Sequence, residues 1–229
     1  MNRSLVLDSG CGYGYGSRYL ADKGADFVVG TDKDPNCIRS AKNWYQTGNL
    51  DFVIADSNYL PLRSNTFDVT ASLEVIEHIK NYEGYLREIK RVLNDEGTLV
   101  LSTPNKHHTD RTRLMPLYHF IEFYPSTLLS LLGRYFVVLH LYGKSIAMSS
   151  SSLLTPTIGI RLRFAIAKVG SIALVRSVLR KMPGQVLHVL RLLLNTSYVP
   201  QLTTEDFKIS KSNVDRASNL IVVCRKVNR

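Results

Sequence analysis

The sequence predicts a doubly wound α/β fold, in which a seven-stranded, mostly parallel sheet is covered by helices on both faces. Three observations support this prediction. Short apolar runs alternate with helical patterns through the first half of the chain, a glycine-rich turn follows the first run, and two more apolar runs lie late in the chain. Strands that are apolar throughout are typical of parallel sheets buried on both faces.

The parallel strands are expected at five apolar runs in the first half. These runs are Leu5–Leu7, Phe27–Gly30, Phe52–Ala55, Phe67–Leu73 and Thr98–Ser102. Between them, residues 17–23, 35–47 and 83–93 have the apolar spacing of amphipathic helices. Asp34 directly precedes Pro35, and this order predicts that Asp34 caps the second helix.

The pattern changes after Pro104. A His-rich loop is expected first, then a helix over 125–132 and a strand over 135–142. The apolar run 220–224 predicts a last strand, which pairs with its predecessor as an antiparallel edge of the sheet. The whole chain, 1–229, is then one domain with a core at 1–145, a helical insertion at 146–204 and a last-strand segment at 205–229.

The net charge of +10 is concentrated in one part of the chain. Residues 123–204 contain no Asp or Glu but nine Lys and Arg, and the cations between 153 and 195 alternate with apolar residues at helical spacing. Basic amphipathic helices bind anionic membrane surfaces. The plain alternative is that the apolar stripe packs on the domain and the cations are solvated. Nucleic acid is disfavoured, because few aromatic residues lie between the charges.

Cellular location is predicted from what the sequence lacks. The three cysteines are an odd number without paired spacing, which favours a reducing compartment. No signal-peptide pattern opens the chain, and Lys or Arg interrupts the longest apolar segments before they could span a membrane. We therefore expect a cytoplasmic protein that contacts the inner face of the membrane peripherally through its basic insertion.

The strongest local pattern is a glycine-rich turn between the first strand and the first helix. It reads Asp8-Ser-Gly-Cys-Gly-Tyr-Gly-Tyr-Gly16. Glycines in such a turn let the backbone approach a ligand beside a helix N-terminus. The spacing does not match the dinucleotide fingerprint, and the Lys-Ser/Thr pair of a phosphate-binding P-loop is missing.

This turn and the segments that follow it resemble the class I S-adenosylmethionine-dependent methyltransferases over about residues 4–145 and the last strand. The resemblance implies a Rossmann-like methyltransferase fold. It also implies that Asp32, after the second strand, holds the ribose hydroxyls and that Asp56, after the third, reads the adenine. The full set of cofactor-binding residues expected from it is Asp8, Gly10, Gly12, Gly14, Asp32, Lys33, Asp56, Ser57 and Leu73. Lys33 departs from the family, which usually has an apolar residue there, although the methylene stem of a lysine can pack on an adenine ring.

Acidic and histidine residues follow the fourth strand, where active sites of open α/β sheets lie. Glu74-Val-Ile-Glu77-His78 and the later His119 resemble the ubiquinone-biosynthesis O-methyltransferases and the small-RNA 2′-O-methyltransferases, in which these four positions bind a divalent metal. Magnesium or zinc held there would lower the pKa of a substrate hydroxyl. Without a metal, Glu77 and His78 orient the loop or the substrate, and His78 or His119 acts as a general base. Glu77, His78 and His119 are therefore the expected catalytic residues.

These features together predict an S-adenosylmethionine-dependent O-methyltransferase that acts on a small-molecule, glycan or lipid-linked acceptor. An acceptor carried on an anionic lipid would explain a basic, apolar insertion on a nearly neutral core. The alternative is an RNA 2′-O-methyltransferase. A non-catalytic partner subunit is less favoured, because the cofactor positions are intact.

Overall fold

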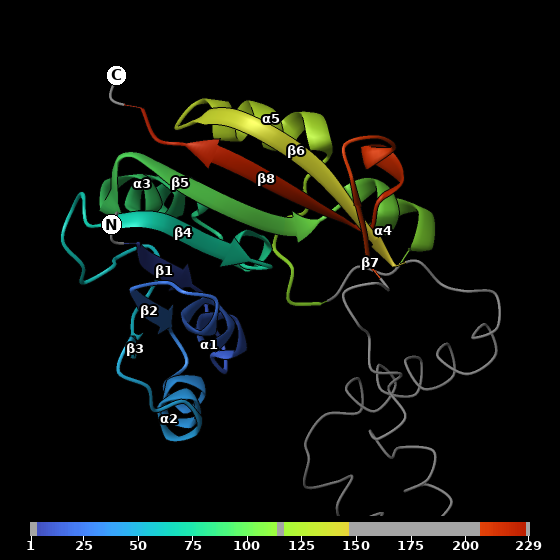
Figure 1. Cartoon of the computed structure of the whole chain (residues 1–229). Helices are drawn as coiled ribbons and strands as arrows, with labels where there is room; N and C mark the ends of the chain where they lie inside the picture. Colours follow the sequence, from blue (N-terminus) through green and yellow to red (C-terminus); the bar gives the residue numbers. More distant parts are fainter. Residues whose placement is uncertain (1–3, 114–116, 147–206, 228–229) are drawn as a thin grey trace, which may run out of the picture. The chain divides into compact units, whose positions relative to one another are not determined.

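The computed structural model describes residues 4–113, 117–146 and 207–227 (Figure 1). Its strands are β1 (Leu5–Ser9), β2 (Phe27–Asp32), β3 (Leu50–Ile54), β4 (Phe67–Leu73), β5 (Leu93–Pro104), β6 (Val137–Ile146), β7 (Phe207–Ser210) and β8 (Asn219–Arg225). Its helices are α1 (Tyr15–Asp22), α2 (Pro35–Trp44), α3 (Tyr82–Val92), α4 (Lys106–Thr112) and α5 (Pro125–Gly133), with short 3₁₀ turns η1 (Ile76–His78) and η4 (Val214–Arg216). The predicted insertion lies almost wholly outside the described residues.

The strands form one sheet in the order β3-β2-β1-β4-β5-β8-β6-β7. Strands β1 to β5 pair in parallel, whereas β8 lies between β5 and β6 and is antiparallel to both. The prediction of a mostly parallel sheet with antiparallel pairing toward one edge is confirmed. The described sheet has eight strands instead of seven, because β7 adds one; its four residues are too few to give a periodic apolar pattern.

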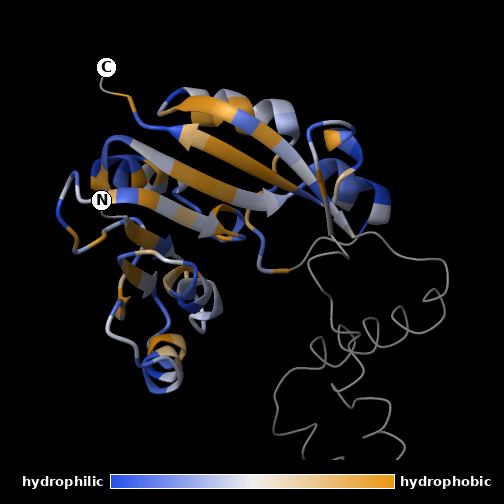
Figure 2. Ribbon diagram, viewed as in Figure 1, coloured by the Kyte–Doolittle hydropathy of each residue, from blue (hydrophilic) through white to orange (hydrophobic). Residues whose placement is uncertain are grey.

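Helices cover both faces of the sheet, as a doubly wound fold requires. Val6 belongs to a core cluster with residues of α1 and α2, whereas its neighbour Leu7 belongs to the larger cluster with residues of α3 and α5. Successive residues of a strand point to opposite faces, so the continuous apolar run of β1 serves both cores. Figure 2 shows the result: the strands are largely hydrophobic, and α4 is hydrophilic.

Asp34 caps α2 as predicted, since its Oδ1 accepts a hydrogen bond from the backbone N–H of Asn36 at 2.8 Å. The prediction of a His-rich loop after Pro104 is wrong, because residues 106–112 form α4. This helix has no apolar periodicity. It begins because Asn105 caps it, accepting a hydrogen bond from the backbone N–H of His107 at 3.1 Å.

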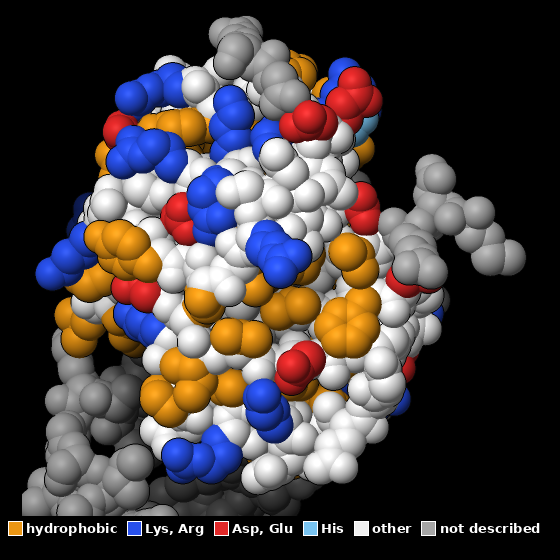
Figure 3. All heavy atoms as spheres, turned by 90° about the vertical axis from the view of Figure 1, so that its left-hand side faces the viewer, with side chains coloured by type: hydrophobic (Ala, Val, Ile, Leu, Met, Phe, Trp, Pro, Cys, Tyr) orange, Lys and Arg blue, Asp and Glu red, His pale blue; other side chains and the backbone are white. Residues whose placement is uncertain are grey.

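The amino ends of the parallel strands lie on the face that Figure 3 turns toward the viewer. Hydrophobic side chains lie in the middle of this face, with Lys and Arg side chains above and below them. The predicted site residues lie at the carboxyl ends of the strands, away from this face. In the part of the chain that the structure describes, no helix is long and apolar enough to cross a membrane.

Candidate active site

The turn between β1 and α1 is held tightly against β2. The backbone N–H groups of Gly10 and Cys11 both donate to the carbonyl oxygen of Thr31, at 2.7 and 2.8 Å. Gly10, Gly12 and Gly14 all have positive φ angles, which L side chains rarely adopt. A Cβ on Gly14 would lie 2.7 Å from the Phe52 ring. Only glycine therefore lets the turn lie this close to the sheet.

Asp32, at the end of β2, is fixed by this turn. Its Oδ2 accepts a hydrogen bond from the N–H of Gly12 at 2.9 Å, and its Oδ1 accepts one from the N–H of Asp34 at 2.9 Å. The side chain is only half-buried, and the neighbouring Lys33 is exposed. A carboxylate oriented in this way can still accept hydrogen bonds from a ligand on its open side.

The other predicted cofactor residues lie at the ends of neighbouring strands. Asp56 is exposed after β3, where its Oδ1 accepts a hydrogen bond from the N–H of Asn58 at 2.8 Å. The hydroxyl of Ser57 accepts a hydrogen bond from that of Ser9 at 3.3 Å, which ties this turn to β1. Leu73 ends β4 and is 48% exposed. The sheet thus places these residues along one edge.

Asp8 lies beneath the glycine turn. Its carboxylate is buried and accepts a hydrogen bond from the hydroxyl of Ser17 in α1 at 2.6 Å. Burial raises the pKa of Asp8 above its usual range. Asp8 therefore links the end of β1 to the start of α1 by a hydrogen bond and stabilises the glycine turn between them.

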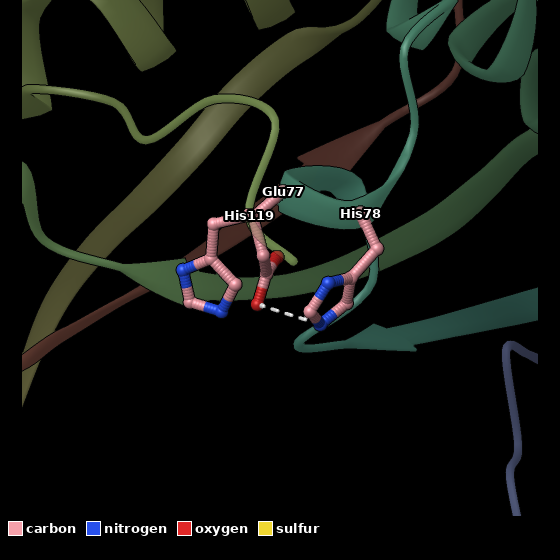
Figure 4. A group of neighbouring side chains, drawn as sticks. All are labelled: Glu77, His78 and His119. Carbon is pink, nitrogen blue, oxygen red and sulfur yellow. Dashed lines mark ion pairs between the residues drawn. The ribbon is translucent and has the colours of Figure 1, made fainter. Parts of the chain in front are cut away.

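A second group of side chains gathers where η1 meets the segment before α5. Figure 4 shows the carboxylate of Glu77 between the imidazole rings of His78 and His119. One potential ligand atom from each residue lies within 4.8 Å of the others. The two ring centroids are 4.9 Å apart. Three of the four residues predicted as metal ligands are therefore brought together.

Glu77 is the most buried member of this group. Its Oε2 accepts a hydrogen bond from the Thr103 hydroxyl at 3.1 Å, whereas Oε1 has no hydrogen-bond partner among the described residues. Burial, with a contribution from the charge of Glu74, raises the pKa of Glu77 to about 7. Oε1 lies 4.0 Å from Nε2 of His78 (dashed line in Figure 4), which is too far for a hydrogen bond. Buried carboxylate oxygens without a hydrogen bond are rare in folded proteins, so this one points to a ligand or a proton.

Both histidines are held through Nδ1. The Nδ1 of His78 lies 3.1 Å from the carbonyl oxygen of Tyr118, and that of His119 lies 2.7 Å from Oε1 of Glu122. Because a carbonyl and a carboxylate can only accept, both Nδ1 atoms carry the proton in the neutral rings. Each Nε2 therefore keeps a free lone pair, which can bind a metal or accept a proton.

Glu122 is a candidate site residue that the sequence prediction missed. Its side chain is only 2% exposed, and its Oε2 has no hydrogen-bond partner within the described part of the chain. A signal for it was present, because Glu122 is the one acidic residue in the apolar run Phe120-Ile-Glu-Phe123. An acidic side chain is rarely buried in such a run unless it is paired.

Glu74 is separated from the group of three. Its φ angle is +57°, its Oε1 accepts a hydrogen bond from Ser102 at 2.6 Å, and its Oε2 accepts one from Asn219 at 2.8 Å. The carboxylate is thus bound to β5 and to the start of β8. Backbone strain of this kind is common beside active sites.

Comparison with known proteins agrees with this geometry. Residues 7–101 match the family model of a methyltransferase domain. A probable S-adenosylmethionine-dependent methyltransferase of Mycobacterium tuberculosis is 33% identical over 129 residues, which are 56% of this chain and 46% of the relative. The ubiquinone biosynthesis O-methyltransferase of Azorhizobium caulinodans is 34% identical over 103 residues, which are 44% of this chain and 40% of the relative. The chain thus spans less than half the length of these relatives.

A solved structure shows the same fold. The S-adenosylmethionine-dependent methyltransferase of Mesorhizobium loti superimposes with a TM-score of 0.58 at 17% sequence identity, covering 98% of this chain and 91% of that one. The family match falls on β1 to β5, the strands whose carboxyl ends carry the glycine turn, Asp32 and Glu77. Residues 7–101 therefore match a methyltransferase domain, and the chain is similar in sequence and in fold to the class I S-adenosylmethionine-dependent methyltransferases.

Proposed function

We propose that the protein transfers a methyl group from S-adenosylmethionine to a hydroxyl oxygen of a small-molecule, glycan or lipid-linked acceptor. The observation that carries the proposal is the pairing of Asp32 with the N–H of Gly12 at the end of β2, which holds a half-exposed carboxylate beside the glycine turn. The histidine group lies on the same edge of the sheet, after β4. Cofactor residues and candidate acceptor residues thus share one edge.

The chain's own residues have separate tasks in this reaction. Asp32 would accept hydrogen bonds from the two ribose hydroxyls, and the turn of Gly10 to Gly14 would let the donor lie against the backbone. Bound S-adenosylmethionine supplies an activated methyl group. Because the donor is already activated, the protein contributes mainly by aligning the two reactants.

The acceptor hydroxyl loses its proton when the methyl group is attached. In the absence of a metal ion, Nε2 of His119 would take this proton, since Nδ1 of the same ring is bound to Glu122. A buried carboxylate that accepts from Nδ1 fixes the ring and stabilises its protonated form. His78, whose ring is held by the Tyr118 carbonyl, would orient the acceptor beside it.

A divalent cation is the further group that the family resemblance implies, and the residues present fit it. Glu77 Oε1 is buried without a hydrogen-bond partner in the described residues, and both histidines have Nδ1 bound and Nε2 free. Glu77, His78 and His119 would hold the cation, which would lower the pKa of the acceptor hydroxyl. Calorimetry with magnesium and with zinc tests this; equal affinity in Glu77→Ala and in the unchanged protein would reject it.

Calorimetric titration with S-adenosylmethionine tests the cofactor site. Asp32→Asn should weaken binding at least about tenfold, because the amide presents a donor where the ribose hydroxyls need an acceptor. Asp22→Asn, an exposed change in α1, is the matched control and should leave binding unaltered. Unaltered affinity in Asp32→Asn would reject the assignment.

The acceptor is identified by transfer of labelled methyl groups. Lipid-linked glycans, quinone precursors and RNA are offered separately to the full chain, and the labelled product is isolated. Label on an oxygen of a lipid-linked or small-molecule acceptor supports the proposal. Label found solely in RNA would establish the alternative activity.

A further inference from the structure

Five aromatic residues lie together on the surface beside the glycine turn, and we call them the aromatic patch: Tyr13, Tyr15, Tyr19, Trp44 and Tyr45. The first four are between 46% and 65% exposed, and Tyr45 is half-buried. They come from the glycine turn, from α1 and from the end of α2. Nothing in the proposed reaction uses them. Exposed aromatic residues gathered in this way usually mark a contact surface.

Trp44 is the centre of the patch. Its ring centroid lies 5.8 Å from that of Tyr13 and 6.4 Å from those of Tyr15 and Tyr45. Tyr15 and Tyr19 lie four residues apart, which places them on one face of α1, and Lys23 follows directly after the helix. The ammonium group of Lys23 lies 5.4 Å from the Tyr19 ring centroid. Four of the rings are thus in contact, and Tyr19 extends the patch along α1 toward a cation.

The composition of the patch indicates its partner. Each aromatic side chain carries a hydroxyl or an N–H group. Within residues 13–45, all exposed large hydrophobic residues are Tyr or Trp, and none is Leu, Ile, Met or Phe. Such side chains suit a boundary that is apolar on one side and wet on the other. The exposed Lys33, Arg39 and Lys42 lie on the adjoining segments, although Lys42 pairs with Asp51 at 3.3 Å. These cations complement an anionic surface, although the exposed acids Asp22 and Asp34 lie on the same segments.

We propose that the aromatic patch docks the protein on an anionic phospholipid bilayer. A nucleic acid fits less well, because Tyr13 and Trp44 already stack on each other at an interplanar angle of 28° and leave no space for a base between them. Since Tyr13 belongs to the glycine turn, docking brings the cofactor site to the membrane interface. The inference names a partner surface for the proposed enzyme but does not require methyl transfer.

Trp44 is the one tryptophan of the chain, so its fluorescence reports on the patch alone. Vesicles of phosphatidylcholine and phosphatidylglycerol should shift its emission to the blue, and lipids with brominated acyl chains should quench it. Vesicles of phosphatidylcholine alone should act more weakly. Sedimentation of the protein with vesicles without any change in Trp44 emission would overturn the proposal, because binding would then use another segment. Quenching by single-stranded RNA but not by vesicles would also overturn it.

A double variant tests the patch independently of the probe. Tyr15→Ser with Tyr19→Ser should lower vesicle affinity at least about tenfold, because two rings no longer enter the interface. Tyr59→Ser is the matched control, since Tyr59 is 77% exposed but lies in the turn after β3. Equal vesicle affinity in the double variant and the control would reject the proposal. Affinity for S-adenosylmethionine, measured on the same samples, shows separately whether the proposed cofactor site is intact.

Discussion

At the scale of single residues, two effects act in opposite directions on Glu77. A carboxylate must be ionised to bind a metal or to accept a proton, whereas burial favours its protonated form. Its pKa is raised from 4.5 to about 7. Between these values the unfolded chain has lost a proton that the folded protein keeps. The free energy of unfolding should therefore fall as the pH rises through this window.

Glu77→Gln removes this dependence while it keeps the shape of the side chain. Between about pH 5 and about pH 8 the unchanged protein should lose roughly 1 to 3 kcal/mol of stability more than the variant does. Urea denaturation at both pH values measures the difference. Parallel losses in the two proteins would show that Glu77 is ionised in the folded state at both pH values. Activity, in contrast, should fall in the variant at every pH.

Glu122 is expected to act through His119 and not on the acceptor itself. Glu122→Gln should lower kcat about 10- to 100-fold with KM for S-adenosylmethionine unaltered, because the amide holds the ring less firmly and does not stabilise its protonated form. The pH profile of kcat should shift as well. Glu83→Gln is the control, because Glu83 forms an exposed ion pair with Arg134. A loss of stability without a shifted pH profile would indicate a purely structural role.

At the scale of elements, continuous apolar runs predict the parallel strands well. The run Phe67–Leu73 is observed with the predicted ends, since it is buried from both sides. β5 begins five residues earlier than predicted because Leu93 pairs with Phe67 across an irregular register. α4 could not be predicted, because it depends on Asn105 and on contacts with η4, which is distant in sequence.

Asn105 should therefore be critical to α4. Its side chain caps the helix and also donates to the carbonyl oxygens of Val214 and Ala217, at 3.0 and 2.9 Å. Asn105→Ala should lower the free energy of unfolding by about 2 to 4 kcal/mol, because a cap, one buried and one partly buried hydrogen bond disappear. Asn81→Ala, which removes only the cap of α3, should cost about 1 kcal/mol. Equal losses, measured by denaturation, would contradict this account.

Substitution by alanine should destabilise the protein at Gly14, in the glycine turn, but not at Gly48. Gly14→Ala should lower the free energy of unfolding by more than about 2 kcal/mol, because φ is +83° and the new Cβ would meet Phe52 and Ala41. It should also weaken binding of S-adenosylmethionine. Gly48→Ala, at a position with open space, serves as control. Thermal denaturation with and without the cofactor compares them; a tolerated Gly14→Ala would mean that the turn can move.

The candidate site was predictable in part. Glu77 and His78 follow from their position after a strand end and from the family pattern, whereas His119 follows from the family pattern alone. Glu122 did not follow, because its role arises from one contact at 2.7 Å in a segment without regular structure. Which oxygen of Glu77 lacks a hydrogen bond likewise depends on Thr103, which lies in β5 and is distant in sequence.

At the scale of the whole molecule, β8 joins the two parts of the described sheet, since it pairs with β5 on one side and β6 on the other. A chain that ends after Ser218 should fail to fold and should aggregate, because both neighbours would expose unpaired strand edges. A chain that ends after Lys226 keeps β8 and should remain folded. Solubility and circular dichroism compare the two, and a folded, soluble shorter chain would show that β8 is dispensable.

The place of β8 also sets an order for biosynthesis. β6 leaves the ribosome long before β8 does. It can pair with β8 only after β8 has been synthesised. Asn219, which holds Glu74, is the first residue of that late strand. The candidate site is therefore completed only after Asn219 has been translated, so a nascent chain stalled before this point would carry the glycine turn without a completed site.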